Sequence, residues 1–366
     1  TVSVLYWLVV MRCLRFAAVL AVLAVLCSAR LSPPPCDVQT VLTPGVGGYA
    51  AYRIPGMATY VSPRLGNASV AIAVAEGRKF GCDDLAGQHD LVLARSVDGG
   101  RTWLHTDPPV VVVDAATGID PALGSNRSAV WDPTPVYDPV TGVVHVLFAW
   151  GSTPEARLHG RNYFFVVTSA DDGVTWSAPR NLTSVTAPHG WPGLTAGNGN
   201  GIAMQGGRYA GRLVVPMYGH VNATIGTGTR VLVSDDHGAT WVLKGGCCHD
   251  TAEPEVAQLW ANPNALYACL RSTARHMDCG SGPGAPTHCR QTAHSPDGGD
   301  TWENFTNVDS IPDPNNKGAV HRLPSLRGLT YSNTGSDTRR VNQTVYLSLD
   351  DGRSWPWRGH VPVAQG

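Results

Sequence analysis

The chain has little net charge, no basic run and few signs of helix. Its 27 Lys and Arg residues are balanced by 28 Asp and Glu residues, which leaves a formal net charge of −1 at pH 7. Proteins that bind nucleic acid concentrate cations on one surface, so no nucleic-acid partner is expected. After residue 30 no apolar period of about 3.6 residues is sustained, which predicts few helices. The 41 Gly and 27 Pro residues favour many turns over a helical bundle.

The chain does contain many short apolar runs of strand length. They are rich in Val, Leu and aromatic residues, and Gly, Pro, Asp or Asn bounds them, which is typical of β-strands. The sequence therefore predicts an all-β fold with strands at Ser69–Ala75, Asp90–Ala94, Val143–Trp150, Tyr163–Thr168, Arg212–Met217, Arg230–Val233, Ala265–Leu270, Leu329–Tyr331 and Thr344–Leu349.

An octapeptide, Ser-x-Asp-x-Gly-x-Thr/Ser-Trp, occurs five times, beginning at Ser96, Ser169, Ser234, Ser295 and Ser348. Its Asp can bond backbone amides of a tight hairpin, its Gly supplies a positive φ, and its Trp can pack the hairpin onto a neighbour. The spacing falls from 73 to 53 residues along the chain, which is too irregular for a stacked solenoid. It suits four-stranded units arranged radially in a β-propeller, with a β-sandwich or β-solenoid as the alternative. The octapeptides are predicted to be structural, so chemistry must lie elsewhere.

The N-terminal segment has the pattern of a secretory signal peptide. A basic start at residues 11–15 leads into the apolar run Phe16–Ala29, with small residues before Arg30. The apolar run is short for a membrane span, and a signal anchor is the alternative. Residues 1–10 precede Met11 and are interpreted as a non-native extension of a fragmentary record, so the folded domain is expected over 30–366.

Glycosylation sequons and cysteines agree with a secreted or lysosomal protein. Seven cysteines follow the signal region, and disulfides are expected, with Cys279–Cys289 as the first choice. Together with His276 and His288 these cysteines suggest a metal site, but the spacing matches no standard zinc pattern, so no metal is predicted. Sequons of the form Asn-x-Ser/Thr occur at Asn67, Asn126, Asn181, Asn222, Asn304 and Asn342.

Two short motifs stand ahead of the five octapeptides: Tyr52-Arg53-Ile54-Pro55 and Glu76-Gly77-Arg78. With them the chain resembles, over roughly residues 45–360, the exo-sialidases (neuraminidases) of bacterial and animal lysosomal type. Their hallmark is an Arg-Ile-Pro followed by several such octapeptides, called Asp-boxes. The resemblance implies a six-bladed β-propeller, here with the last blade expected to be incomplete. It also implies a retaining exo-α-sialidase that needs no cofactor and removes terminal sialic acids from glycoproteins, glycolipids or oligosaccharides.

A sialic acid carries a carboxylate at its anomeric carbon, so an enzyme for it needs a cationic clamp. Arginine suits this task because its planar fork binds carboxylate through two hydrogen bonds and keeps its charge. The resemblance implies three clamp residues, which match Arg53, Arg271 and Arg340, with Arg339 as the neighbour that competes with Arg340. Arg78 resembles the family arginine that reaches the C4 side of the sugar.

The family's acid/base is an Asp on a loop just after Glu/Asp-Gly-Arg, which matches Asp83, with Asp84 in reserve. Such a group must be protonated to assist the leaving oxygen, so partial burial would have to raise its pKa from about 3.9. Sialidases attack with a Tyr, since a carboxylate nucleophile would be repelled by the substrate carboxylate. A Glu draws off the phenol proton, and Glu253 resembles that Glu, with Glu255 as the alternative.

The nucleophilic Tyr is expected on the strand after the last Asp-box, but no Tyr follows Tyr346 in the chain. Tyr346 is predicted on the strand beside the third Arg, so it is not assigned, and a truncated record is the expectation. Two segments match family pockets more loosely. Asp132 in Trp131-Asp132-Pro133 is placed near the sugar's amide or C4 region. Trp191 in Gly190-Trp191-Pro192 is placed in the glycerol or N-acetyl pocket. The alternative for both is a turn or packing role.

Two other functions stay open on the sequence. A lectin-like propeller that binds sialic acid without catalysis would keep the three arginines and need no Tyr. A propeller that binds proteins would use the Asp-boxes only as a scaffold. The expected partners are sialylated glycans, with membrane contact only through an uncleaved signal anchor.

Overall fold

The computed structural model of the chain describes residues 39–153, 162–186, 193–222, 226–273, 279 and 287–361. The predicted signal peptide, the upstream extension, Trp191 and His276 lie outside these ranges. Within them, helical structure is limited to α3 (Thr183–Thr186) and two 3₁₀ turns, Pro63–Leu65 and Pro324–Leu326. No helix in the described ranges is long and apolar enough to cross a membrane. The all-β prediction is confirmed.

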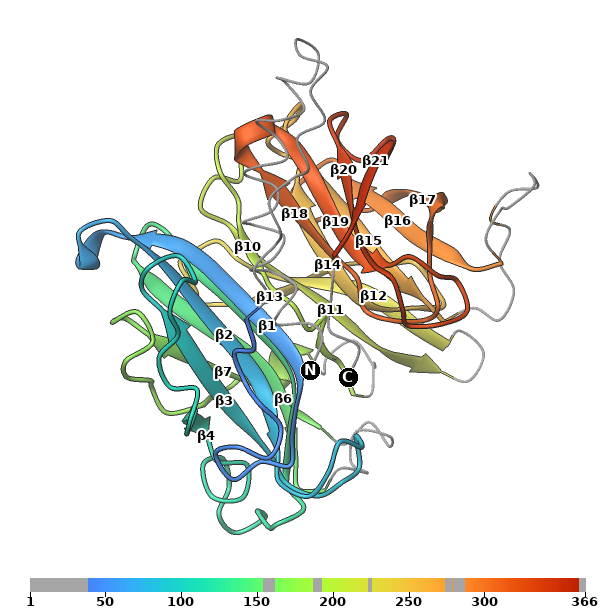
Figure 1. Ribbon diagram of the computed structural model, residues 1–366. Helices are drawn as coiled ribbons and strands as arrows, with labels where there is room; N and C mark the ends of the chain where they lie inside the picture. Colours follow the sequence, from blue (N-terminus) through green and yellow to red (C-terminus); the bar gives the residue numbers. More distant parts are fainter. Residues whose placement is uncertain are drawn as a thin grey trace, which may run out of the picture.

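The strands form five consecutive four-stranded units, the first two on the left of Figure 1 and the last two on the right. The first unit comprises β1 (Ala51–Ser62), β2 (Ala68–Arg78), β3 (His89–Ser96) and β4 (Val110–Val113). The second comprises β5 (Ala129–Asp138), β6 (Val143–Gly151), β7 (Tyr163–Ser169) and β8 (Arg180–Asn181). The third comprises β10 (Ile202–Ala203), β11 (Leu213–Asn222), β12 (Gly226–Ser234) and β13 (Val242–Cys247), with β9 (Thr195–Ala196) also paired to β11.

The fourth unit comprises β14 (Thr251–Gln258), β15 (Leu266–Ser272), β16 (Cys289–Ser295) and β17 (Glu303–Pro312). The fifth comprises β18 (Ala319–Leu323), β19 (Gly328–Thr334), β20 (Gln343–Ser348) and β21 (Trp357–His360), so the last described unit has four strands. Six blades were expected, and five such units lie within the described ranges.

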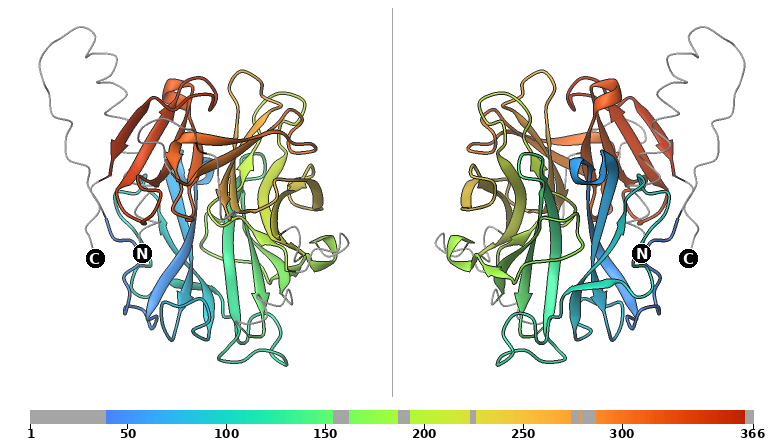
Figure 2. Two further views of the ribbon diagram at one scale, coloured as in Figure 1. Left: turned by 90° about the vertical axis from the view of Figure 1, so that its right-hand side faces the viewer. Right: turned by 90° about the vertical axis from the view of Figure 1, so that its left-hand side faces the viewer.

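Within each unit, strands that follow one another in the chain pair antiparallel. One parallel contact, His89 with Ala129, joins the first and second units. These up-and-down ladders differ from the parallel ladders of a β-solenoid and are typical of propeller blades. Figure 2 shows the sheets from two sides, with the strands of neighbouring units inclined to one another.

Each Asp-box joins the third and fourth strands of its unit through the same hydrogen bonds. In all five, the amide of the box Gly donates to the Ser hydroxyl at 2.8 Å. The Asp carboxylate in turn accepts from the Ser hydroxyl and from the Thr or Ser at position seven. The Gly has positive φ, and so does the residue before it, which is Gly99, Asp172, His237, Gly298 or Asp351. The structural interpretation of the boxes is confirmed.

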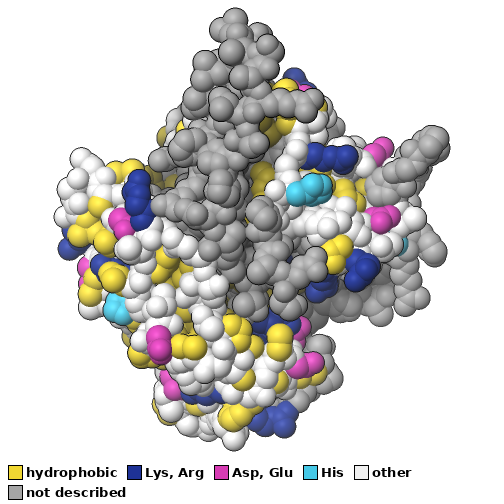
Figure 3. Space-filling view, in the orientation of Figure 1, with side chains coloured by type: hydrophobic (Ala, Val, Ile, Leu, Met, Phe, Trp, Pro, Cys, Tyr) yellow, Lys and Arg dark blue, Asp and Glu magenta, His cyan; other side chains and the backbone are white. Residues whose placement is uncertain are grey.

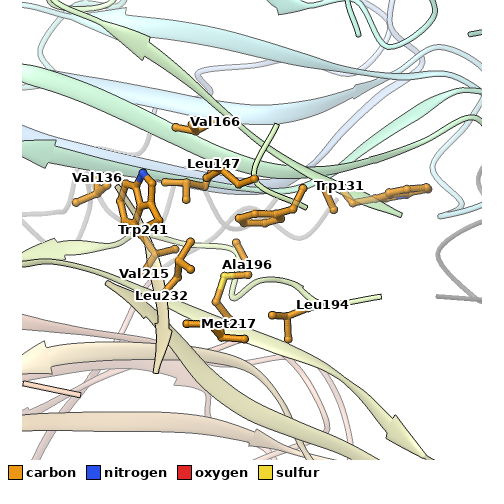
Figure 4. Packing of buried hydrophobic residues seen from close by; sticks show 14 of the residues in the cluster. Trp131, Val136, Leu147, Val166, Leu194, Ala196, Val215, Met217, Leu232 and Trp241 are labelled. Carbon is orange, nitrogen blue, oxygen red and sulfur yellow. The ribbon is translucent and has the colours of Figure 1, made fainter. Parts of the chain in front are cut away.

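The box tryptophans pack between neighbouring units. Trp241 of the third unit lies with Leu147 of the second unit and Val215 of the third in one buried cluster (Figure 4). Trp176, Trp302 and Trp355 likewise pack between their own unit and the preceding one. The core is therefore divided into a series of interfaces between units, and each fully buried large apolar side chain there contributes about 1.5–3 kcal/mol.

All nine predicted strands are present, and each is the second or third strand of a unit. The first strands went unpredicted because β1, β5 and β14 contain Pro55, Pro133 and Pro254, which lack the N–H that a ladder uses. At each of these prolines the register slips in a bulge. The residue before each proline has a positive φ, of 52° at Ile54, 53° at Asp132 and 40° at Glu253.

Charges of both signs are mixed on the face of the molecule that Figure 3 shows. Figure 3 shows Lys and Arg interspersed with Asp and Glu on the described part of one face, without a large patch of either sign. This distribution agrees with the formal net charge of −1.

Candidate active site

The predicted site residues lie at the end of the strands opposite to the Asp-boxes. In these units the first strand begins at this end and the second strand ends there. Arg53 and Glu253 stand near the starts of β1 and β14, and Asp132 stands near the start of β5. Arg78 and Arg271 stand at or near the ends of β2 and β15. Strand direction thus gathers residues from distant parts of the chain at one end of the molecule.

Arg53 and Arg78 form a first arginine pair around the loop that follows β2. Arg78 is fully buried, and its Nε and Nη2 donate to Glu76 Oε2 at 3.0 and 2.5 Å. Its Nη1 donates to the Cys82 carbonyl at 2.7 Å, and its Nη2 lies 2.8 Å from Asp84 Oδ1. Burial acts to lower the pKa of Arg78, but Glu76 and Asp84 outweigh it and the pKa is raised. Arg53 Nη1 shares both loop partners, at 3.2 Å from the Cys82 carbonyl and 3.4 Å from Asp84 Oδ1.

The two candidate acids on this loop have different contacts. Asp84 forms ion pairs with Arg53 and Arg78, and its side chain is 56% exposed. Asp83 is also exposed, and its Oδ1 accepts a hydrogen bond from the Leu85 amide at 2.8 Å. The structure therefore brings Asp84 against the two arginines, whereas Asp83 accepts its hydrogen bond within its own turn.

Arg271 and Arg340 form a second arginine pair, which meets at Asn315. Arg271 Nε donates to Asn315 Oδ1 at 2.6 Å, and Arg340 Nη2 donates to the Asn315 carbonyl at 2.9 Å. Asn315 has a φ of 58° and lies between β17 and β18. Arg339 donates its backbone amide to the Ser336 hydroxyl. Of the two neighbouring arginines, Arg340 is therefore the one whose side chain meets Arg271 at Asn315.

Glu253 joins the second arginine pair to the middle of the site. Its Oε2 lies 2.5 Å from Arg271 Nη1, and its Oε1 accepts from Asn198 Nδ2 at 3.3 Å. The Glu253 side chain is 12% exposed. Glu255 is fully buried two residues further along β14, where its Oε2 lies 2.9 Å from Lys317 Nζ. The sequence left both glutamates as candidates, and the structure distinguishes them, because of the two only Glu253 contacts Arg271.

Asp132, on β5 of the second unit, bonds residues of the first and third units, and through Asn198 it is connected to Glu253 of the fourth unit. It is buried, and its carboxylate accepts from Thr195, Tyr218 and Asn198 at 3.1, 3.1 and 3.3 Å. Its backbone amide donates to Glu76 Oε1 at 3.1 Å. A continuous series of polar contacts therefore runs from the first arginine pair to the second.

Sequence reasoning missed Asn198, Tyr218 and Asn315. Asn198 and Asn315 each have a positive φ. The runs Gly-Asn-Gly-Asn-Gly and Asn-Asn in which they lie are typical of such turns, and they were the feature of the sequence that could have indicated these residues. Tyr218 gave no signal, because a Tyr on an apolar strand is most often part of the core. Tyr346, which was not assigned, is indeed buried in the cluster between the fourth and fifth units.

Two disulfides lie at this end of the molecule. The predicted Cys279–Cys289 bond is present, so those two cysteines are not metal ligands. A second bond, which was not predicted, joins the adjacent residues Cys247 and Cys248 just before β14. Among the described His, Cys, Asp and Glu side chains, no group of three or more is arranged to hold a metal ion.

Comparisons with known proteins identify the family to which this chain belongs. The family described as BNR repeat-like domain matches residues 72–359. The sialidase of Micromonospora viridifaciens is 30% identical over 336 residues, which cover 87% of this chain and 47% of that protein. The sialidase of Bacteroides fragilis is 29% identical over 327 residues, which cover 84% of this chain and 54% of that protein. The chain thus spans about half the length of the curated relatives it matches.

Among solved structures, that of the Hadza microbial sialidase Hz136 superimposes with a TM-score of 0.71 at 26% sequence identity. The match covers 90% of this chain and 63% of that chain. This likeness confirms the sialidase-like β-propeller fold that the five units indicate. Because the family match extends over most of the chain, the protein belongs to the sialidase family with a BNR repeat-like domain.

Proposed function

We propose that this protein is a retaining exo-α-sialidase that acts on the terminal sialic acids of glycoproteins, glycolipids or oligosaccharides. The observation that carries the proposal is the pairing of four arginines at one end of the molecule, with Glu253 in direct contact with Arg271. Arg53, Arg271 and Arg340 would bind the substrate carboxylate. Arg53 and Arg340 now bond oxygens that a substrate carboxylate can replace, whereas Arg271, with five N–H donors, can keep its contact with Glu253.

Asp83 is the residue that we assign as acid/base. A general acid has to carry a proton, and Asp84 already forms ion pairs with two arginines. Asp83 bonds its own loop instead and is exposed, so bound substrate would have to supply the burial that protonation of the leaving oxygen requires. Glu253 would draw the proton from a Tyr nucleophile, and its contact with Arg271 holds its carboxylate within the site.

Arg271→Ala tests the clamp. Removing one partner of a charged, partly buried contact costs about 2–5 kcal/mol, so turnover of a fluorogenic sialoside and affinity for 2-deoxy-2,3-didehydro-sialic acid should fall at least about thirtyfold. Arg64→Ala is the control, because Arg64 is an exposed arginine away from the site that donates to the Ala170 carbonyl. Equal turnover and affinity in Arg271→Ala and the wild type would overturn the clamp assignment.

A lectin-like function is the second candidate, and the four arginines at one end of the molecule support it equally. It retains the arginines and needs no nucleophile. Saturable binding of sialyllactose by the wild type, abolished in Arg271→Ala and without release of sialic acid, would identify this function. Turnover of the same sugar would exclude it.

We also propose that the protein enters the secretory pathway. The Cys279–Cys289 disulfide supports this, since such bonds persist in oxidising compartments. Further support comes from the sequon asparagines whose exposure is described, because all of them are exposed: Asn67, Asn126, Asn181, Asn304 and Asn342. A shift to lower mass on treatment of the cell-derived protein with an N-glycosidase is the expected result, and an unchanged mass would contradict it.

A further inference from the structure

Glu253 stands on a backbone that needs outside support. Its φ of 40° is a left-handed conformation, and the register between β14 and β15 slips between Ala252 and Glu255. A non-glycine residue in such a conformation persists only where its surroundings hold it. The contacts around the segment Glu253-Pro254-Glu255, which we call the glutamate bulge, show what holds it.

Lys317 holds the glutamate bulge from the side of the fifth unit. It lies between β17 and β18, and its side chain is 20% exposed. Its Nζ donates to the Pro254 carbonyl at 3.4 Å and to Glu255 Oε2 at 2.9 Å. One ammonium group therefore bonds both the backbone and a side chain of the bulge, on the residues directly after Glu253.

The third unit holds the glutamate bulge from the other side. Asn198 Nδ2 donates to Glu253 Oε1 at 3.3 Å. A Cβ at Gly197 would collide with the Pro254 carbonyl, and one at Gly199 would come within 3.1 Å of Glu255 Oε2. The close approach of these two glycines leaves no room for the bulge to move toward the third unit.

Glu255 is the buried anchor of this arrangement. It is fully buried, and the charged or titratable groups that face it are Lys317, His321 and Arg290. His321 Nε2 lies 3.5 Å from Glu255 Oε1. Without Lys317 the carboxylate would lose the one lysine that neutralises it, and the chain around it would have to rearrange or take up a proton.

We propose that Lys317 is a positioning residue for Glu253 and, through Glu253, for Arg271. Lys317 acts on the bulge, the bulge directs the Glu253 carboxylate, and that carboxylate bonds Arg271 Nη1 at 2.5 Å. The expected loss of sialoside binding rests on the proposed function, because Arg271 and Glu253 have their roles only there. The expected displacement of Glu253 does not depend on the proposed function.

Lys317→Met tests the geometry directly, since it keeps most of the aliphatic stem and removes the ammonium group. In a crystal structure of this variant we expect Glu253 to leave the left-handed region and its contact with Arg271 to break. Lys244→Met is the matched control, because Lys244 is partly exposed and forms one ion pair, at 3.3 Å with Asp300. An unchanged Glu253 backbone and an intact contact in Lys317→Met would overturn the proposal, whether or not the protein binds sialosides.

Binding measurements then distinguish positioning from general stabilisation. Affinity for 2-deoxy-2,3-didehydro-sialic acid should fall about tenfold in Lys317→Met, recover in Lys317→Arg, and stay unchanged in Lys244→Met. In a Glu253→Gln background, Lys317→Met should cause no further loss, because its effect passes through Glu253. An equal loss in both backgrounds would contradict the proposal. If Lys317→Met does not fold, Glu255→Gln removes the ion pair and leaves the Lys317 bond to the Pro254 carbonyl, so a smaller displacement of Glu253 and a smaller loss of affinity are expected, and no change in either would contradict the proposal.

The two proposals can fail separately. If the wild type binds no sialoside and Arg271→Ala changes nothing, the proposed function fails while the displacement of Glu253 in Lys317→Met still supports positioning. If Arg271→Ala abolishes binding but Lys317→Met leaves both binding and geometry as they are, the positioning role fails alone.

Discussion

At one end of each unit the Asp-box repeats the same hydrogen bonds five times, whereas at the other end the set of side chains differs from unit to unit. The box end uses a Ser, an Asp and a Gly in every unit. The site end uses Arg53 and Arg78 in the first unit, Asp132 in the second and Glu253 in the fourth. Within one fold, repetition thus serves the scaffold, and divergence between units supplies the chemistry.

The two ends also differ in how far apart in the chain their partners lie. Hydrogen bonds within the boxes join residues two to four positions apart. Those of Asp132 join residues 56, 66 and 86 positions apart. Box geometry is therefore a local property of eight residues, while site geometry exists only after the units have packed together.

The largest expected effect is at the site end. Arg78→Met removes the partner of the fully buried Glu76, and breaking such a pair costs about 3–5 kcal/mol of the free energy of unfolding. Arg101→Met is the control at the box end, because Arg101 is exposed, and it should change stability by less than about 0.5 kcal/mol. Urea unfolding measures both, and similar losses in the two variants would remove the contrast between the ends.

A smaller effect is expected from the disulfides of the site end. Replacing Cys279 and Cys289 by Ala opens a cross-link between residues ten positions apart and should cost about 2–3 kcal/mol. Cys247 and Cys248 are adjacent, so their bond restricts little chain, and replacing both should cost less. Urea unfolding of both double variants under oxidising conditions tests this order, and the reverse order would show that packing around Cys248 dominates.

Removing one box hydroxyl should have a moderate and uniform effect. Ser→Ala at Ser169, Ser234 or Ser348 leaves a buried Gly amide and an Asp oxygen with one partner fewer, which costs about 1–2 kcal/mol. Because the hydrogen bonds are the same in each box, thermal unfolding should give nearly equal losses for the three variants. A spread as wide as that among site-end variants would show that the boxes are not equivalent.

The two ends also differ in the pH dependence of stability, which has opposite signs at the box end and the site end. At the box end burial acts to raise the pKa of Asp98, but the hydrogen bonds from Thr102, Ser96 and Arg101 together outweigh it and lower the pKa to about 2. A carboxyl whose pKa is lowered on folding contributes stability that is present above its unfolded pKa of about 3.9 and is lost as the pH falls toward 2.

At the site end burial raises the pKa of Glu255 from 4.5 to about 7, against the opposing influence of Lys317 and Arg290. A raised pKa means that the folded state holds the proton more tightly, so this stabilisation is present below pH 4.5 and is lost as the pH rises through 7. Melting temperatures measured from pH 2 to 8 should rise at the acid end of the range, and Glu255→Gln should flatten the decline between pH 4.5 and 7. An unchanged decline in Glu255→Gln would assign it to another group.

The strands that sequence analysis predicted and those that it missed divide along the same line. The predicted strands are all second or third strands of their units, such as β6 (Val143–Gly151) and β12 (Gly226–Ser234), where burial demands continuous apolar residues. The first strands β1, β5 and β14 carry Arg53, Asp132 and Glu253, and their prolines, bulges and polar residues hide the β pattern. The features that obscure these strands in the sequence are the ones that turn Asp132 and Glu253 toward the site.

The candidate residues show a similar contrast between what local motifs indicate and what contacts between units determine. Arg53, Arg78, Arg271, Arg340 and Glu253 were identified from their motifs, and all of them lie in one connected set of contacts. Their roles stay predictions. Their partners were not identified, because an Asn or a Tyr in a loop or a strand has many ordinary functions and only its neighbours in space distinguish them.

The all-β class, the five hairpins and the motifs of the sialidase family depend on residues a few positions apart, so the amino-acid sequence alone predicts them. Packing between the units places Asp84 against the arginines while Asp83 bonds its own loop, lets Glu253 reach Arg271 while Glu255 is buried against Lys317, and brings Asn315 between two arginines. Each of these outcomes depends on which side of a bulge or turn a side chain leaves the backbone. Contacts with other units set that direction, at separations in the chain that no local pattern encodes.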